Sequence, residues 1–293
     1  MTALLSTSPA LFIGVVFILA LLIGSFLNVV IYRLPVMMER EWREQCAEIE
    51  GSAPAELPED KFNLIVPRSR CPNCGTLISA WQNIPVLSYL LLRGCCGHCK
   101  AGISIRYPLV EAVTAILAAL VAWRFGFGWE ALMGIVLTLM LVPITMIDFD
   151  HQLIPDSIVL PLLWIGLSMS LFHPLPGSET LFISSHDAIV GALVGYLSLW
   201  SFYWLFKLLT GKDGMGHGDF KLLAALGAWL GYQYLFAIVI MSAVVGALLG
   251  IALILLRGRD RQVPMPFGPF LAAAGWLVMM YGDELKALLH IPF

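Results

Sequence analysis

Gly214-Met215-Gly216-His217-Gly218-Asp219-Phe220-Lys221 is a glycine-rich turn that contains an acidic residue and runs directly into an apolar segment beginning Leu222-Leu223. A carboxylate at the mouth of a membrane segment costs free energy, so such a residue is a functional candidate. A second acidic turn, Ile147-Asp148-Phe149-Asp150-His151-Gln152-Leu153-Ile154-Pro155-Asp156, closes another apolar segment. We therefore ask whether the two turns belong to one site.

The composition defines the class of protein. Of the 293 residues, 59% are hydrophobic and 13% are charged, whereas soluble domains contain about 45–50% apolar and about 25% charged residues. We therefore expect an all-α polytopic membrane protein. No basic residue precedes the first apolar run and no small-x-small site follows it, so we expect no cleaved signal peptide.

The apolar residues cluster into about eight segments, each a candidate transmembrane segment. They are Ala10–Ile31, Leu109–Trp123, Glu130–Ile147, Ser157–Phe172, Ala188–Phe206, Phe220–Leu230, Tyr234–Leu256 and Phe267–Tyr281. Phe220–Leu230 is too short for a full crossing. We expect it to be tolerated only where protein or a wet cavity surrounds it.

The basic residues predict an orientation. If the polar stretch Tyr32–Tyr107 is cytoplasmic, alternating crossings place fifteen of the 17 Lys and Arg residues inside and leave Arg124 and Lys286 outside. Such a bias is the positive-inside pattern. The same topology brings the turns at Asp148 and Asp219 to one membrane face. We expect three parts: a first transmembrane segment (1–32), a cytoplasmic cysteine-rich domain (33–107) and a membrane-embedded catalytic domain (108–293).

Two carboxylates brought together cannot easily both ionise, so one keeps its proton. The ionised acid can activate a water while the protonated acid donates to a carbonyl oxygen. This is aspartic-protease chemistry, and Asp148 and Asp219 are the candidate catalytic residues. The alternative is that the acids are helix caps or solvated loop residues, and this alternative carries most weight for Asp150 and Asp156. The glycines before Asp219 let the backbone turn tightly and approach other groups closely.

Six cysteines lie in the polar stretch, and four of them form two CxxC pairs. Cys71-Pro72-Asn73-Cys74 and Cys96-Gly97-His98-Cys99 are separated by a spacing close to that of zinc ribbons. Four thiolates close a structural tetrahedral zinc site. Redox-active thiols and unliganded cysteines are the alternatives. Cys95 could compete with Cys96 as a ligand, and Cys46 is an isolated thiol.

Several motifs together resemble one known family, the bacterial type IV prepilin peptidases, which are intramembrane aspartic proteases of the GxGD type. Gly216-His217-Gly218-Asp219 matches the GxGD motif. Further matches are the segments Gly24–Pro35, Arg106–Glu111 and Pro266–Phe270. The resemblance covers nearly the whole chain and assigns the two catalytic aspartates to Asp148 and Asp219, since the family's first acid lies six residues before the Ile of Ile154-Pro155.

The resemblance implies a function. Family members remove the short basic leader from prepilins and type II secretion pseudopilins at the cytoplasmic face of the bacterial inner membrane. Members with a cysteine-bearing loop generally also N-methylate the new N-terminus with S-adenosylmethionine. Prepilins, pseudopilins and membrane lipids are the implied partners, with no role for nucleic acid. The chain shows no glycine-rich Rossmann fingerprint for the methyl donor.

Two other classes of function compete with this interpretation. Paired intramembrane acids also serve proton- or cation-coupled transporters, but no inverted repeat is visible and the acids lie at one face. A zinc-bearing assembly factor without catalysis is the second alternative. Among the remaining polar residues, Glu111 is expected to pair with a basic residue or bind the substrate amine, and Asn28 to hydrogen-bond a neighbouring helix. Lys221 is expected to hold Asp219 ionised or to bind lipid phosphate.

Overall fold

The structure is a computed structural model that describes residues 2–51, 62–174, 181–257 and 265–289. Within these ranges the regular secondary structure is helical, with two isolated β-bridges and no strand, which confirms the all-α class. The α-helices are α1 (Thr2–Thr7), α2 (Pro9–Glu50), α3 (Leu87–Leu91), α4 (Arg106–Phe125), α5 (Trp129–His151), α6 (Asp156–Met169), α7 (Ser185–Thr210), α8 (His217–Leu230), α9 (Leu235–Arg257) and α10 (Gly268–Leu289). The short 3₁₀ helices are η1 (Ala80–Asn83), η2 (Ser170–Phe172) and η3 (Tyr232–Tyr234).

The chain divides into two compact units, Met1–Leu120 and Val121–Phe293. The first unit holds α1 to α3, the cysteine-rich loops and most of α4, and the second holds the remaining helices. The three-part division drawn from the sequence stays a prediction. Lys61, Arg259 and Arg261, which contribute to the charge count, lie outside the described residues.

All eight predicted apolar segments are helical. Five helical segments in the described ranges are long and apolar enough to cross a membrane: Pro9–Glu50, Arg106–Phe125, Trp129–His151, Ser185–Thr210 and Tyr232–Leu256. The helices α6 and α8 have 14 residues each, and α10 carries charged residues in its last two turns. The chain is therefore a multi-pass helical protein in which shorter helices complete the second unit.

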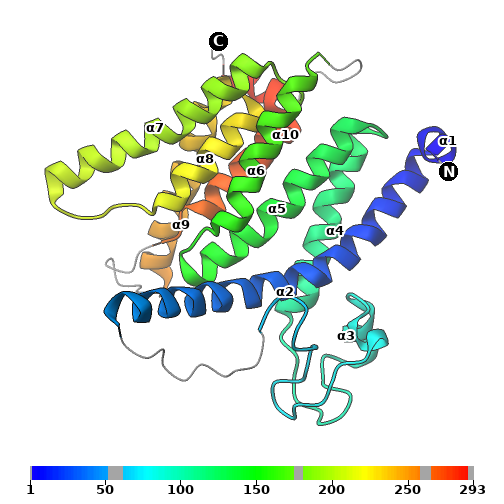
Figure 1. The fold of residues 1–293 in the computed structure, drawn as a ribbon. Helices are drawn as coiled ribbons and strands as arrows, with labels where there is room; N and C mark the ends of the chain where they lie inside the picture. The colour runs from blue at the N-terminus through cyan, green and yellow to red at the C-terminus, as the bar shows by residue number, and fades with distance from the viewer. Residues whose placement is uncertain (1, 52–61, 175–180, 258–264, 290–293) are drawn as a thin grey trace. The chain divides into compact units, whose positions relative to one another are not determined.

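The first helix is much longer than the predicted segment Ala10–Ile31. α2 continues to Glu50 and has 42 residues, or about 63 Å at 1.5 Å per residue, which is about twice the hydrocarbon thickness of a bilayer. Its apolar part is followed by a strongly charged part with an exposed ion pair between Arg43 and Glu39. Figure 1 shows two limbs set at an angle, and Pro35 is the helix-interior residue that can interrupt the hydrogen-bond ladder.

The short helix α8 is the core of the second unit. It packs against α6, α7 and α10, and Figure 1 shows it in yellow alongside α7. Ten of its residues after Asp219 are buried: Phe220, Leu222, Leu223, Ala224, Ala225, Leu226, Gly227, Ala228, Trp229 and Leu230. This agrees with the expectation that a helix too short to span the membrane is tolerated where protein surrounds it. The helix that begins at the glycine-rich turn is therefore the central helix of the second unit.

Candidate active site and metal centre

Asp148 lies in the last turn of α5, where the helix leaves the apolar core. It is only 5% exposed, whereas Asp150 is exposed. Residues two positions apart project from different faces of a helix, so only one of these acids can point inward. The helix ends at Gln152, whose left-handed backbone (φ 54°) lets its N–H donate to the Asp148 carbonyl oxygen at 2.9 Å. The structure thus buries the acid that the sequence assigned to catalysis.

Asp219 lies in the first turn of α8 and is 7% exposed. Its backbone N–H donates to the carbonyl oxygen of Gly216, the N-cap residue, at 3.2 Å. The first turn of a helix leaves N–H groups without intrahelical partners and carries a partial positive charge, which favours a carboxylate there. The predicted helix start beside Asp219 is confirmed.

The two acids come from separate helices and meet in the second unit. Both lie beside the side chain of Ile154: Gly268, next to Asp148 Oδ2, and Gly218, next to Asp219 in the chain, each approach it closely. Asp148 Oδ2 is buried and accepts no hydrogen bond from the described residues. A buried acceptor without a partner is costly. The arrangement presents an acid pair with an oxygen available to a water or a substrate.

Ile154 and two glycines form the apolar wall beside the acids. A Cβ atom on Gly268 would lie 2.6 Å from Asp148 Oδ2 and 2.9 Å from Ile154 Cδ1. A Cβ atom on Gly218 would lie 2.7 Å from Ile154 Cβ. Contacts this close exclude any side chain at both glycines. Ile154 therefore packs between the segment that carries Asp219 and the first residue of α10.

The glycines before Asp219 were expected to allow a tight turn and a close approach of other groups, and the structure supports the second of these reasons. None of Gly214, Gly216 and Gly218 has positive φ, so the turn does not need their left-handed freedom. Gly214 and Gly218 are required for close approach instead, since a Cβ atom at Gly214 would lie 2.7 Å from the Phe206 ring. A Cβ atom at Gly216 would meet only Asp219 Oδ2, at an ordinary 3.8 Å.

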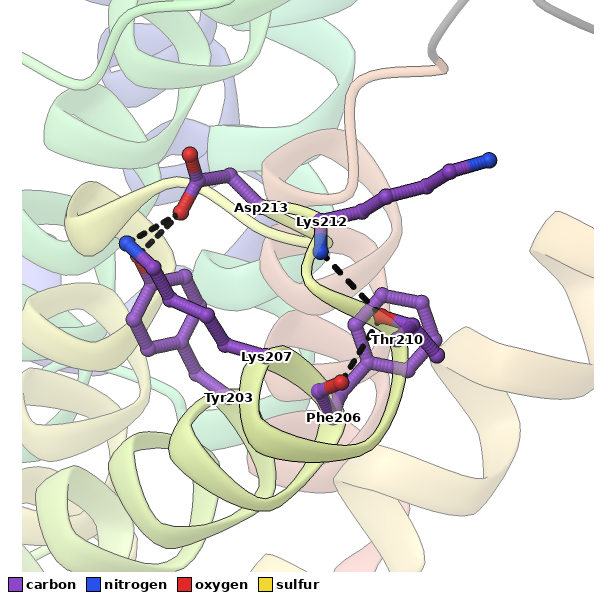
Figure 2. A network of polar contacts seen from close by, with 6 residues as sticks. All are labelled: Tyr203, Phe206, Lys207, Thr210, Lys212 and Asp213. Atoms are coloured by element: carbon purple, nitrogen blue, oxygen red, sulfur yellow. Dashed lines mark hydrogen bonds and ion pairs between the residues drawn. The ribbon is translucent and has the colours of Figure 1, made fainter.

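The loop between α7 and α8 is fastened to the end of α7. Asp213 Oδ1 accepts from the Tyr203 hydroxyl at 2.5 Å and from Lys207 Nζ at 2.8 Å. Figure 2 shows the Asp213 carboxylate turned back towards α7 while the Lys212 side chain points away. These donors lower the pKa of Asp213, the Lys207 ammonium group first. The network fixes the loop that leads into the glycine-rich turn.

Tyr203 also joins an aromatic cluster at the start of α8. Its ring centroid lies 5.3 Å from that of His217 and 5.8 Å from that of Phe220. His217 is exposed and contacts these rings. The cluster holds the first turn of α8 against α7.

Lys221 does not bind Asp219 and instead pairs with another acid of the second turn. Its Nζ atom donates to both carboxylate oxygens of Asp156 at 2.7 Å. Asp156 is the first residue of α6. The pair therefore joins the N-terminal ends of α6 and α8.

In the first unit, the four predicted ligands Cys71, Cys74, Cys96 and Cys99 converge, with their sulfur atoms within 4.8 Å of one another. The Sγ atoms of Cys71 and Cys99 are 3.8 Å apart, which matches the edge of about 3.8 Å in a tetrahedron with zinc–sulfur bonds of about 2.3 Å. The residues present therefore fit a four-thiolate zinc site.

The two CxxC pairs form matching knuckles. In the first, the Gly75 N–H donates to the Cys71 carbonyl oxygen at 2.9 Å and the Cys71 N–H to the Thr76 carbonyl oxygen at 2.9 Å. In the second, the Lys100 N–H donates to the Cys96 carbonyl oxygen at 3.1 Å and the Cys96 N–H to the Ala101 carbonyl oxygen at 2.8 Å. Short antiparallel bridges, Arg70 with Leu77 and Cys95 with Gly102, flank the knuckles at equivalent positions.

This correspondence separates Cys95 from Cys96. Cys95 occupies the bridge position held by Arg70 in the first knuckle, and Cys96 occupies the ligand position held by Cys71. Cys46 lies on α2, is exposed and is not a member of the cluster. The geometry assigns the four thiols of the cluster without Cys95.

One thiol in each knuckle has a lowered pKa, whereas burial and the neighbouring thiols raise the pKa of Cys71. The Thr76 hydroxyl and backbone N–H lower the pKa of Cys74 to about 6. The backbone N–H groups of Cys99 and His98 lower the pKa of Cys96. Because the thiolate is the metal-binding form, the knuckles are prepared for a cation.

Polar contacts connect α2 with the rest of the first unit. Arg33 is buried and donates to the carbonyl oxygens of Asn63 at 2.9 Å and Pro67 at 2.6 Å. Asn28 donates to the Tyr107 carbonyl oxygen at 3.1 Å, as expected for an interhelical contact. Glu111 is buried and accepts from the Val86 N–H at 2.8 Å. The partner of Glu111 is thus a backbone amide and not the basic residue that one of the two expectations named.

The structure adds residues that sequence reasoning missed. Ile154 was noted only as part of Ile-Pro, Gly268 only as part of a matched motif, and Asp213 not at all. The Pro266–Phe270 motif was a usable signal for Gly268. No sequence signal identifies Asp213, because its partners Tyr203 and Lys207 lie in the preceding helix and belong to no motif.

Comparisons with known proteins match both halves of the chain. Residues 18–125 match the family model described as the bacterial peptidase A24 N-terminal domain, and residues 135–251 match that of the type IV leader peptidase family. A protein of Stutzerimonas stutzeri named prepilin leader peptidase/N-methyltransferase is 53% identical over 97% of this chain and 95% of its own length. Proteins of the same name from Aeromonas hydrophila (53% identical, 94% of this chain and 93% of the relative) and Dichelobacter nodosus (47% identical, 94% of both) are also similar. No solved structure matches the chain.

Proposed function

Because this chain belongs to the type IV leader peptidase family, we propose that it is a membrane-embedded aspartic endopeptidase that removes the leader from prepilins. The observation that supports this proposal is that Asp148 of α5 and Asp219 of α8 are both buried, with Ile154 packed against the glycines beside each of them. No nucleophilic side chain or catalytic metal is needed for this chemistry.

The acid pair supplies a general base and a general acid. The ionised carboxylate takes a proton from a water, and the resulting hydroxide attacks the carbonyl carbon of the scissile peptide bond. The protonated carboxyl group donates to the carbonyl oxygen, which yields a tetrahedral diol. Transfer of a proton to the amide nitrogen then releases the leader and leaves a free N-terminal amine on the pilin. The low exposure of both acids limits competing water around the reacting atoms.

The direct test is a cleavage assay with purified protein and a prepilin in detergent. Asp148→Asn and Asp219→Asn should each abolish cleavage, because an amide can neither accept the water's proton nor exchange it. Asp150→Asn is the matched control, since this acid is exposed, and it should retain cleavage. Cleavage by both dyad mutants at the wild-type rate would reject the acid pair.

We further propose that the protein N-methylates the new N-terminus with S-adenosylmethionine as methyl donor. The support is the name shared by the relatives and the cysteine knuckles of the first unit. Transfer of a labelled methyl group from S-adenosylmethionine to the cleaved pilin is the test. No labelled product after complete cleavage would rule this activity out.

The metal proposed for Cys71, Cys74, Cys96 and Cys99 is structural zinc, which would cross-link the two knuckles. Four thiolates leave no open coordination position, so the ion would take no part in peptide cleavage. Type II secretion pseudopilins are proposed as further substrates. The positive-inside pattern supports a bacterial inner-membrane location with the knuckles and the acid pair on the cytoplasmic side.

A further inference from the structure

We propose that Lys221 and Asp156 form a positioning pair that holds Asp219 at its working distance from Asp148. The inference rests on the proposed peptidase function. Lys221 lies two residues after Asp219 in α8, and its Nζ atom binds both oxygens of Asp156 at 2.7 Å. Neither residue of the pair is assigned a contact with the substrate.

The ion pair links the two chain segments that carry the acids, close to each acid. α5 ends at His151 just after Asp148, and α6 begins at Asp156 after a four-residue connection. That connection contains Pro155, whose ring restricts the backbone. Asp156 is thus tied closely to Asp148 along the chain, as Lys221 is to Asp219. The ion pair links these two segments directly.

Two opposing influences act on the separation of the acids. Ile154 stands against Gly218 and prevents the start of α8 from moving closer to the turn after α5. Repulsion between two ionised carboxylates would drive the segments apart. The Lys221–Asp156 pair opposes that separation, while the Ile154–Gly218 contact sets its lower limit.

The location of Lys221 supports this role over a stabilising one. A lysine in the second turn of a helix gains nothing from the macrodipole, which favours anions at the N-terminal end. The side chains of Lys221 and Asp156 are 30% and 54% exposed, and exposed ion pairs contribute little to the free energy of unfolding. A displacement of about 1 Å at a reacting group, however, can lower the rate by about 100-fold.

The test is a double-mutant cycle in the full-length protein. We measure kcat and KM for prepilin cleavage by Lys221→Met, Asp156→Asn and the double mutant. Each single mutant should lower kcat by about tenfold with KM changed less than about twofold, and the double mutant should be no slower than the singles. Lys221→Arg, which keeps the charge, should recover most of kcat.

Glu284→Gln is the matched control. It breaks the Arg124–Glu284 ion pair (2.8 Å), which is also partly exposed and joins the last turn of α4 to α10. Arg124 lies just before the start of α5, and Asp148 lies near its other end. This variant should keep the wild-type kcat, and all variants should unfold within about 3 °C of the wild type, as expected for exposed pairs in a domain of this size.

Three results would overturn the proposal. They are wild-type kcat in both single mutants, additive losses in the double mutant, and a shifted pH profile in Lys221→Met but not in Asp156→Asn. The last would mean that Lys221 acts on Asp219 through its charge alone. Asp148→Asn and Asp219→Asn in the same assay separate this failure from that of the proposed function. If they are inactive while Lys221→Met is fully active, only the positioning pair fails.

Discussion

Lys100 occupies in the second cysteine knuckle the place that Gly75 occupies in the first. Both residues donate to the carbonyl oxygen of the first cysteine of their pair, and both have a left-handed backbone, with φ of 61° and 68°. For glycine this conformation costs little, but for a residue with a Cβ atom it costs about 1–2 kcal/mol. The second knuckle is therefore the strained one.

Lys100→Gly should stabilise the metal site. Removal of the strain should strengthen metal binding by about fivefold, or about 1 kcal/mol, measured by competition with a chelator. Lys100→Ala removes the same charge but keeps the Cβ atom, so it should leave the affinity near that of the wild type. Equal gains in both variants would show that the lysine charge, and not the backbone, is responsible.

Cys96→Ser should lose the bound metal, whereas Cys95→Ser should retain it. Cys96 belongs to the four-thiol cluster, and Cys95 holds a bridge position outside it. Metal analysis of the purified variants measures the stoichiometry directly. Loss of metal in Cys95→Ser with retention in Cys96→Ser would reverse the assignment.

Gly218→Ala should lower kcat by at least about tenfold, because its Cβ atom would lie 2.7 Å from Ile154 Cβ and displace Asp219. Gly216→Ala is the comparison, since its Cβ atom meets only an ordinary contact at 3.8 Å. We expect Gly216→Ala to remain within about threefold of wild type, apart from a small loss of N-cap stability. An equal loss of kcat in the two variants would mean that the glycines are needed for their backbone freedom and not for the contact with Ile154.

Gly268→Ala should also inactivate the enzyme, by about 10- to 100-fold in kcat, because the methyl group would lie 2.6 Å from Asp148 Oδ2. Gly250→Ala in α9 is the control: its Cβ atom meets only Met265 Cε at 3.6 Å. Steady-state cleavage rates of the two variants show whether the close contact between Gly268 and Asp148 is needed for activity. Full activity of Gly268→Ala would mean that the start of α10 moves freely away from the acid.

The Asp213 network predicts a pH-dependent contribution to stability. Hydrogen bonds from Lys207 and Tyr203 lower the pKa of Asp213 below its ordinary value of 3.8. The stabilisation is therefore complete above that value and is lost as the pH falls through the lower, folded pKa. The difference in Tm between wild type and Asp213→Asn should be constant from pH 7 to about 5 and shrink below about 4. A difference that grows on acidification would contradict the network.

Local sequence patterns predicted the elements of both sites. Asp148 and Asp219 stand out because acids are costly beside apolar segments, and the CxxC spacing identifies the four clustered thiols. The continuation of α2 to Glu50 was not foreseen, because the change from apolar to charged residues resembles the end of a helix. Glu and Arg are nevertheless good helix formers, so the charged part extends the same helix.

The contacts around the acids could not be predicted from the sequence. The glycines of the turn predicted tight backbone geometry and close approach, but not which residues approach: the backbone angles are ordinary, and Gly218 and Gly214 are needed because of Ile154 and Phe206. Such a requirement depends on residues far away in the chain. The partnership of Lys221 with Asp156, 65 positions apart, is of the same kind.

Ile154 has no chemistry of its own, yet it touches both glycine segments that enclose the acids. Its volume therefore acts as a spacer whose size must suit three parts of the chain at once. A smaller residue would leave the distance between Asp148 and Asp219 unconstrained, and a larger residue would increase it. Changes at this position are thus expected to be tolerated only together with changes at Gly218 or Gly268, so an inert side chain can restrict how the catalytic machinery evolves.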